Sequence, residues 1–342
     1  MARTRRPARV AEGGKRPMCT GLSFTTADHY FGRNLDLEFS YNETVTVTPR
    51  NFPFPFHRLP SLPTHHAIIG IATIADGYPL YYDAVNEKGL GMAGLNFPDN
   101  AHYPAPGSGD TEVTPFEFIP WVLGQFETVA EVKEALRSVS LVDINFSPEF
   151  PLSPLHWIIA DKSASITVES VRGGLKVYDN PWGVLTNNPT FDIQSFRLND
   201  YQHLSKRQPE NTFASDVPMD LYSRGMGGIG LPGDLSSSSR FVKAVFTRMN
   251  SVCGTSESES ISQFFQILGS VAQQRGCVQV GDEDKYEITI YSSCANTATG
   301  VYYYTTYENS QITGVDMHKE DLDGSELAAY PLVKGQQIAM QN

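Results

Sequence analysis

Cys19 is the residue in this sequence that could by itself supply both groups needed for nucleophilic catalysis. It follows Met18 and precedes Thr20 and Gly21. If the mature chain began at Cys19, its thiol would be the nucleophile. Its own α-amine, with a reference pKa of about 7.7 to 8.0, would accept the thiol proton directly or through water. The alternative is that Cys19 is a small core residue near the start of a strand.

Other common catalytic and metal-binding patterns are missing from the sequence. There is neither the G-x-S-x-G turn of α/β-hydrolases nor the H-E-x-x-H zinc motif. The adjacent His65 and His66 lie beside a predicted strand and would point in opposite directions, so they could not share a metal. The four cysteines form no C-x-x-C pair, and we expect Cys253, Cys277 and Cys294 to be reduced core residues. We expect no metal, nucleotide or organic cofactor.

A glycine-rich segment from Gly225 to Gly230 satisfies the G-x-G-x-x-G pattern of dinucleotide-binding proteins. That pattern binds phosphate only where it leaves a buried strand and begins a helix. Here Pro218 and a polar segment precede it, and Leu-Pro-Gly-Asp follows at 231–234. We therefore interpret it as a flexible glycine loop, which could lie beside an active site.

Most of the elements that must position Cys19 are predicted to be strands. Residues 44–48 alternate β-branched side chains, and residues 67–74 form an apolar run typical of a covered strand, with a proline-aromatic loop at 52–63 between them. Further strands are predicted at 80–85, 91–97, 156–160, 166–170, 175–178, 286–291, 301–307 and 312–317. Residues 172–174 form a predicted hairpin turn.

Three helices are predicted from capping and apolar spacing. Thr128 and Glu131 form a capping box, followed by an apolar stripe from Val129 to Val139. Two more apolar stripes run over 241–249 and 261–271. Helices among many strands, without strict βαβ alternation, indicate an α+β layered sandwich with largely antiparallel sheets. No linker-like composition follows residue 19, which favours one domain over 19–342.

Charge separates the first eighteen residues from the rest of the chain. The 342-residue chain has a net charge of −12, yet residues 1–18 hold six basic residues and one acidic residue, a local +5 that leaves −17 for the remainder. Because an acidic body repels phosphate backbones, we expect no nucleic-acid partner. We interpret residues 1–18 as a disordered basic leader or a misassigned start, removed in the active form.

Neither a membrane anchor nor a secretion signal is evident. No stretch approaches the roughly 18 apolar residues of a membrane span, and no apolar core of a signal peptide follows the basic N-terminus. We expect a cytoplasmic protein. If translation starts at Met18, aminopeptidase removal of that methionine would expose the α-amine of Cys19.

A series of motifs then occurs in order along the chain. They are MCTG at 18–21, FGRNLD at 31–36, YNE at 41–43, TPR at 48–50, NEKGLGMAGLNFP at 86–98, LHW at 155–157, VLTNNPTFD at 184–192, LPGD at 231–234, SRF at 239–241 and YYYTTYEN at 302–309. Together they resemble the choloylglycine hydrolase family, which comprises bile salt hydrolases and penicillin V acylases. The resemblance covers essentially residues 18–342. It implies an N-terminal-nucleophile (Ntn) hydrolase fold, a four-layer αββα sandwich.

The resemblance also implies roles for six residues. Cys19 matches the nucleophile, and Arg33 and Asp36 match the arginine and aspartate of the G-R-N-x-D element. A guanidinium near sulfur favours thiolate, and a carboxylate can orient the α-amine. The remaining matches are Asn96 and Asn187, at positions that form or adjoin the oxyanion hole, and Arg240, a second active-site arginine that would support developing negative charge.

The implied reaction is hydrolysis of a linear amide. The thiolate of Cys19 attacks the carbonyl, the amine leaves, and water assisted by the α-amine hydrolyses the thioester. Position 96 is Asn, as in similar bile salt hydrolases, whereas penicillin V acylases commonly carry Tyr there. This favours glycine- or taurine-conjugated bile acids, bound by Cys19, Arg33, Asn96 and Leu35, with loop 52–60 and residues 144–150 as further groove walls.

The sequence is also compatible with other functions. One is an acylase for penicillin V or N-acyl homoserine lactones on the same machinery. Another is a non-catalytic bile-acid or lipid-binding homologue in which the leader persists and Cys19 is idle. Family members are commonly homotetramers, so the resemblance implies a homo-oligomer. While residues 1–18 remain attached, the nitrogen of Cys19 is an amide and cannot act as a base, so the full-length chain should be inactive.

Overall fold

Two antiparallel sheets account for most of the predicted strands. The computed structural model describes residues 18–107, 109–281 and 284–342, and of the predicted leader only Met18 lies within them. The first sheet has the order β12 (Val184–Leu185), β1 (Cys19–Thr25), β2 (His29–Leu37), β13 (Ile288–Asn296), β14 (Val301–Thr306) and β15 (Asn309–Asp316). The second has the order β11 (Gly174–Asp179), β10 (Ser165–Val171), β9 (Leu155–Ala160), β6 (Gly91–Asn96), β5 (Tyr78–Asn86), β4 (Ile68–Ala75), β3 (Thr44–Thr48) and β16 (Ala328–Pro331).

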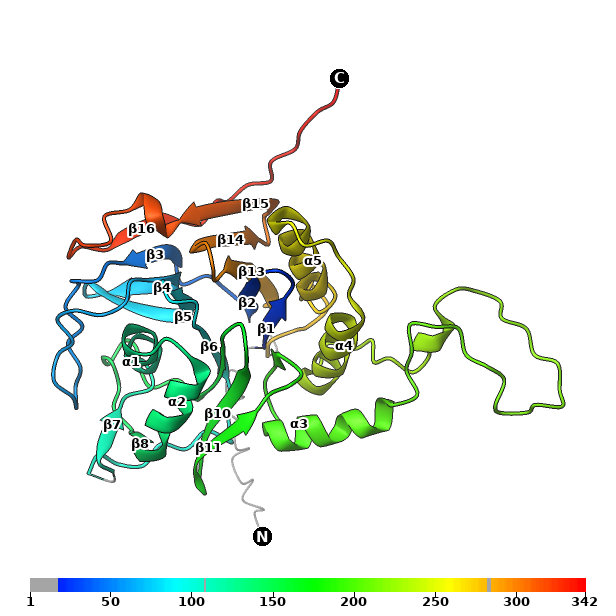
Figure 1. Cartoon of the computed structure of the whole chain (residues 1–342), viewed down its shortest axis with the longest axis horizontal. Coiled ribbons are helices and arrows are strands. Elements are labelled where there is room, and N and C mark those ends of the chain that lie inside the picture. Colours follow the sequence, from blue (N-terminus) through cyan, green and yellow to red (C-terminus); the bar gives the residue numbers. More distant parts are fainter. Residues whose placement is uncertain (1–17, 108, 282–283) are drawn as a thin grey trace, which may run out of the picture.

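Helices cover the outer faces of both sheets, which gives the predicted four layers (Figure 1). On the first sheet, α4 (Ser237–Asn250) packs against β1 and β12, and α5 (Glu257–Gly269) packs against β2 and β13. On the second sheet, α1 (Phe118–Gln125) packs against β4, β5 and β6, and α2 (Val129–Ala135) lies beside it. The inner faces meet where β1 and β2 contact β6. The α+β sandwich expected from the sequence is therefore confirmed.

The apolar residues form two cores, the first of which spans two of the three interfaces between the four layers. One core includes Leu22, Phe31 and Ile158 from the facing sheets and Phe264 from the helix layer. The other lies between the second sheet and α1 and α2, and includes Trp157. Because successive strand residues point to opposite faces, the neighbours Trp157 and Ile158 enter different cores. A short parallel pair, β7 (Thr111–Val113) and β8 (Val139–Leu141), lies outside both sheets.

The predicted helices exist, but two end before their apolar stripes do. One is α5, which ends at Gly269, two residues before Val271. The capping box of Thr128 and Glu131 is present, yet α2 ends at Ala135 and a 3₁₀ turn, η1 (Leu136–Ser138), follows. Val139 already belongs to β8, because that strand pairs with β7. The apolar stripe therefore runs through an α-helix, a 3₁₀ turn and the start of a strand. Two α-helices of the described residues, α1 and α3 (Phe191–Arg197), were not predicted.

The cysteines and the glycine segment also differ in part from their predictions. All four thiols are free; Cys294 is buried, Cys253 is partly buried and Cys277 is exposed, so Cys277 is not a core residue. In the glycine segment, Met226 to Gly228 form a short 3₁₀ turn that neither leaves a strand nor begins an α-helix. Gly227 instead allows close approach of the backbone, since a Cβ there would lie 1.9 Å from the carbonyl oxygen of Arg207.

Tight backbone packing also marks β2, a strand that was not predicted. Gly32 lies against β13, and a Cβ there would stand 2.0 Å from the carbonyl oxygen of Ser293. Every residue of β2 is buried, including Arg33 and Asp36. The strand is thus fixed between β1 and β13 at the centre of the first sheet.

Candidate active site

Cys19 begins β1 and lies buried beside β2. It pairs with Leu35 across the sheet, and 2% of its surface is exposed. Its backbone N–H donates a hydrogen bond to Oδ1 of Asn187, 2.8 Å away. Burial raises the pKa of the Cys19 thiol, and the nearby charge of Arg33 opposes that shift. Cationic help is therefore needed for the thiolate to form at this position.

Arg33 and Asp36 come from β2 and lie on either side of Leu35 in the sequence. The Arg33 side chain donates to the carbonyl oxygens of Tyr82, at 3.0 Å, and of Gly94. Its Nη2 has no hydrogen-bond partner within the described part of the chain. Carbonyl dipoles thus neutralise the buried charge of Arg33 only in part, so this charge can still stabilise a neighbouring thiolate.

The Asp36 carboxyl is fully buried and shares its surroundings with a second arginine. It accepts a hydrogen bond from the Thr289 hydroxyl at 2.6 Å, and its Oδ2 lies 4.0 Å from Nη1 of Arg240. Burial raises the pKa of Asp36 to about 6, a shift that Arg240 opposes. The Asp36 backbone N–H donates to the carbonyl oxygen of Met18 at 3.1 Å. Asp36 therefore flanks the Met18–Cys19 peptide bond.

Arg240 lies in the first turn of α4, where a cation is unfavourable unless other groups hold it. Its Nη1 donates to the carbonyl oxygen of Cys19 at 2.6 Å and to the Thr20 hydroxyl at 2.7 Å. Its Nη2 donates to Oδ1 of Asn187 at 2.8 Å, and its Nε to the carbonyl oxygen of Leu235 at 3.0 Å. The planar guanidinium thus joins α4, β1 and Asn187 with a single side chain.

Asn187 uses both ends of its amide to connect neighbouring elements. Oδ1 accepts from Cys19 and Arg240, and Nδ2 donates to the backbone carbonyl of Asn96 at 2.7 Å. Its backbone N–H donates to the Ser237 hydroxyl at 2.9 Å. Asn96 ends β6 and is 8% exposed. The Asn187 side chain therefore orients the nitrogen of Cys19, and hydrogen bonds or close charges connect all six predicted residues in one cluster.

Two buried carboxyl groups near this cluster were not predicted. Glu287, which precedes β13, accepts a hydrogen bond from the backbone N–H of Met18, and burial raises the pKa of Glu287 to about 8. Asp83 on β5 accepts from the hydroxyls of Tyr291, at 2.6 Å, and Ser293, at 2.8 Å. Single acidic residues at strand positions carry no motif, so only their burial in the fold distinguishes them.

The predicted groove walls lie in two places. Leu35 is buried in the core that contains Cys19. Loop 52–60 and residues 144–150 both pack on the other core through Tyr78, whose ring lies 5.8 Å from that of Phe54 and 5.7 Å from that of Phe146. The two loops are therefore neighbours, but they pack on a different core from Leu35 and Cys19.

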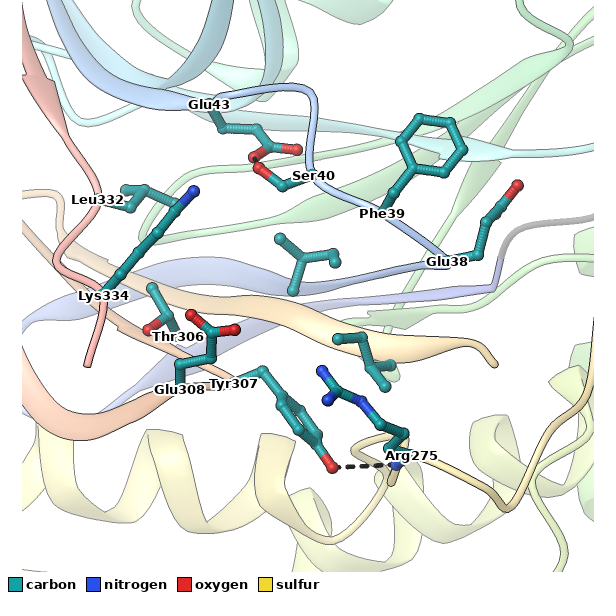
Figure 2. Close-up of a pocket in the computed structure, with 12 residues that line it drawn as sticks. Glu38, Phe39, Ser40, Glu43, Arg275, Thr306, Tyr307, Glu308, Leu332 and Lys334 are labelled. Atoms are coloured by element: carbon teal, nitrogen blue, oxygen red, sulfur yellow. Dashed lines mark hydrogen bonds between the residues drawn. The ribbon is translucent and has the colours of Figure 1, made fainter. Parts of the chain in front are cut away.

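A separate surface pocket of about 220 Å³ lies at the carboxyl end of β2 (Figure 2). Glu38 and Phe39 line one side, and the Arg275 guanidinium stands 5.1 Å from the centre of the Tyr307 ring on the other. The backbone N–H of Arg275 donates to the Tyr307 hydroxyl at 3.0 Å. None of the predicted site residues lines this pocket.

Within 18–107, 109–281 and 284–342, no three histidine, cysteine or acidic side chains cluster as metal ligands would. Nor does this part of the chain hold a helix long and apolar enough to cross a membrane.

The chain is similar in sequence and in structure to amide hydrolases of one family. The sequence model of the family described as linear amide C–N hydrolases, choloylglycine hydrolase family, matches residues 19–330. A protein named bile salt hydrolase/transferase from Lactiplantibacillus plantarum is 58% identical over 315 residues, covering 92% of this chain and 97% of that protein. A crystal structure of a conjugated bile acid hydrolase from Clostridium perfringens is 41% identical with a TM-score of 0.88, covering 95% of this chain and all of that one. A penicillin V acylase from Agrobacterium tumefaciens shares the fold at 19% identity and a TM-score of 0.69, covering 93% and 95% of the two chains.

Proposed function

Because the chain belongs to the choloylglycine hydrolase family of linear amide C–N hydrolases, we propose that it hydrolyses the amide bond of glycine- or taurine-conjugated bile acids. The substrate class rests on the names of similar proteins, a bile salt hydrolase/transferase at 58% identity and a conjugated bile acid hydrolase at 41%. Asn at position 96, which the resemblance associates with bile salt hydrolases, also favours bile salts over penicillin V in this proposal.

The observation that carries the chemistry is the hydrogen bond between the Cys19 nitrogen and Asn187 Oδ1 at 2.8 Å. In a chain beginning at Cys19 this nitrogen becomes an α-amine on the same residue as the thiol. Asn187, itself held by Arg240, would keep that amine beside the sulfur so that it accepts the thiol proton. Arg33 then favours the thiolate against the opposing effect of burial.

The reaction proceeds in two steps. The thiolate attacks the amide carbonyl, and the amine returns its proton to the departing glycine or taurine as the C–N bond breaks. The same amine then assists water in hydrolysing the thioester, which releases the bile acid and restores the thiol. Asn96, at the end of β6, is the proposed side-chain donor to the oxyanion.

The active form in this proposal is the single domain 19–342. Intact-mass spectrometry of an active preparation should show Cys19 as the first residue. Retention of Met18 in a working enzyme would refute the mechanism, since an amide nitrogen is not a base.

A matched pair of cysteine variants tests the nucleophile. Cys19→Ser should reduce glycine release from glycocholate by about 10³-fold or more with the fold unchanged, because a hydroxyl is a far weaker nucleophile. Cys277→Ser is the control, since Cys277 is the exposed free thiol. Equal activity in both variants would exclude Cys19 as nucleophile, and faster release of 6-aminopenicillanate from penicillin V than of glycine would exclude the bile-salt assignment.

We also propose that the chain is a homotetramer that assembles through a projecting arm. The arm, residues 205–227 between α3 and α4, extends away from both sheets (Figure 1) and is closed at its base by the Ser205 N–H to Gly227 carbonyl bond of 2.9 Å. It exposes large apolar side chains, with Phe213 92% and Tyr222 81% exposed. Exposed apolar residues concentrated in one segment are typical of an interface.

Light scattering after size exclusion tests the assembly. A Phe213→Ser, Tyr222→Ser double variant should elute as a smaller species, because the apolar contacts of the arm would be lost. Val252→Ser, which removes an apolar side chain that is 80% exposed outside the arm, should leave the mass unchanged. An unchanged mass of the arm variant would contradict the proposal.

A further inference from the structure

His156 and Glu169 form a fully buried pair on adjacent strands of the second sheet. They face each other across β9 and β10, with Nδ1 of His156 3.1 Å from Oε1 of Glu169. Neither side chain has exposed surface. His156 points toward the first sheet, like Ile158 two residues later, and so lies on the same side of the sheet as the active site.

The other edge of the His156 ring reaches the strand that leads to Asn187. Nε2 donates to the carbonyl oxygen of Thr186 at 2.8 Å, and Thr186 is the residue immediately before Asn187. The flat face of the ring stacks on Phe97, with centroids 4.1 Å apart and planes 5° from parallel. Phe97 immediately follows Asn96. One imidazole therefore contacts the neighbours of both active-site asparagines.

Glu169 extends this contact to the segment that follows Asn187. Its Oε1 also accepts the backbone N–H of Phe191 at 3.0 Å, at the first residue of α3. The turn from Thr186 to Phe191, which carries Asn187, is thus held at one end by His156 and at the other by Glu169. Buried polar pairs of this kind fix geometry when each member is hydrogen-bonded.

The contact with Thr186 fixes which ring nitrogen of His156 donates to the backbone. A carbonyl oxygen only accepts hydrogen bonds, so Nε2 is the donor there, while Nδ1 faces the carboxyl group of Glu169. Both ring nitrogens are therefore engaged, which holds the imidazole in one orientation.

We propose that His156 is a positioning residue for catalysis: through Thr186 it holds Asn187 where its amide oxygen orients the Cys19 amine, and Glu169 holds the imidazole for that task. The proposal rests on the proposed function for its turnover test. A second test, alkylation of Cys19, is independent of that function, because alkylation depends on the same amine and needs no bile salt.

Two polar variants at position 156 separate the two hydrogen bonds of the ring. His156→Gln can place an amide donor near the position of Nε2 and keep the Thr186 contact, whereas His156→Asn reaches only toward Glu169. Trp157→Phe is the control, because Trp157 is equally buried on the same strand but enters the other core. All variants are made in the chain that begins at Cys19 after processing.

The asparagine variant should lose about 10- to 100-fold in kcat on glycocholate with KM within about twofold, while the glutamine variant stays within about fivefold of the parent. Iodoacetamide should alkylate Cys19 about tenfold more slowly in the asparagine variant than in the glutamine variant. Equal kcat and equal alkylation rates in the two variants, or an equal loss in Trp157→Phe, would overturn the proposal. A parent enzyme that releases no glycine while the alkylation rates still differ would instead contradict the proposed substrate.

Discussion

Replacing Arg240 by lysine tests whether the geometry of the guanidinium, and not only its charge, organises the site. The ammonium group of lysine could satisfy the Cys19 carbonyl and the Thr20 hydroxyl, which share Nη1 in the native chain. The contacts of Nη2 with Asn187 and of Nε with the Leu235 carbonyl would be lost. Arg240→Lys therefore removes two of four charged hydrogen bonds.

The size of the effect follows from those two bonds. A hydrogen bond to a charged group contributes about 1.5 to 3 kcal/mol, so the free energy of unfolding should fall by about 3 to 6 kcal/mol. For a chain of 342 residues this lowers Tm by about 4 to 8 °C. The Asn187 contact alone bears on catalysis, and its loss should lower kcat about 10- to 150-fold.

Arg248→Lys provides the control for this experiment. Arg248 lies about two turns further along α4 and donates through Nε to the Ser23 carbonyl at 2.6 Å, also on β1 but away from Cys19. Glycine release from glycocholate and thermal unfolding would be measured for both variants at equal folded concentration. The reasoning is refuted if Arg240→Lys keeps kcat within threefold of the parent, or if Arg248→Lys loses as much.

Three further outcomes are expected. The free energy of unfolding of Glu287→Gln, relative to that of the parent chain, should rise between about pH 4.5 and 8 and then level off, because the raised pKa of Glu287 makes its ionisation unfavourable only in the folded state. The rise should be at most about 1.4 kcal/mol per pH unit. Denaturant unfolding that shows the same difference between variant and parent at pH 5 and pH 8 would contradict this. Ser256→Ala removes the capping box of α5 and should cost about 1 kcal/mol, or about 1 to 2 °C in Tm, with kcat unchanged. Gly32→Ala should prevent soluble expression, since its Cβ would overlap the Ser293 carbonyl, and a well-folded Gly32→Ala protein would show that β2 can shift.

Features with a local cause could be predicted from the sequence. The capping box at Thr128 and Glu131 needs only residues three apart, and the alternation at 44–48 needs only one covered face. Both predictions are confirmed. The end of α2 could not be predicted, because Val139 leaves the helical stripe to pair with a distant strand, β7.

The active-site strands show the limit of such reasoning. In β2, Arg33 and Asp36 are buried charges, which no strand pattern anticipates. Their burial is compensated by groups from far along the chain, such as Thr289, 253 residues after Asp36. The family resemblance identified these positions. The roles of Glu287 and His156 carried no comparable signal, because each depends on contacts that exist only in the folded chain.

The nitrogen of Cys19 donates to Asn187 while it is still joined to Met18. If the active form begins at Cys19, as proposed, this contact is in place before the Met18–Cys19 bond is broken. Cleavage would then turn an amide nitrogen that is already oriented into an amine, without a new arrangement of β1 or Asn187. In that case the cleaved and uncleaved chains should have the same thermal unfolding profile apart from the residues removed.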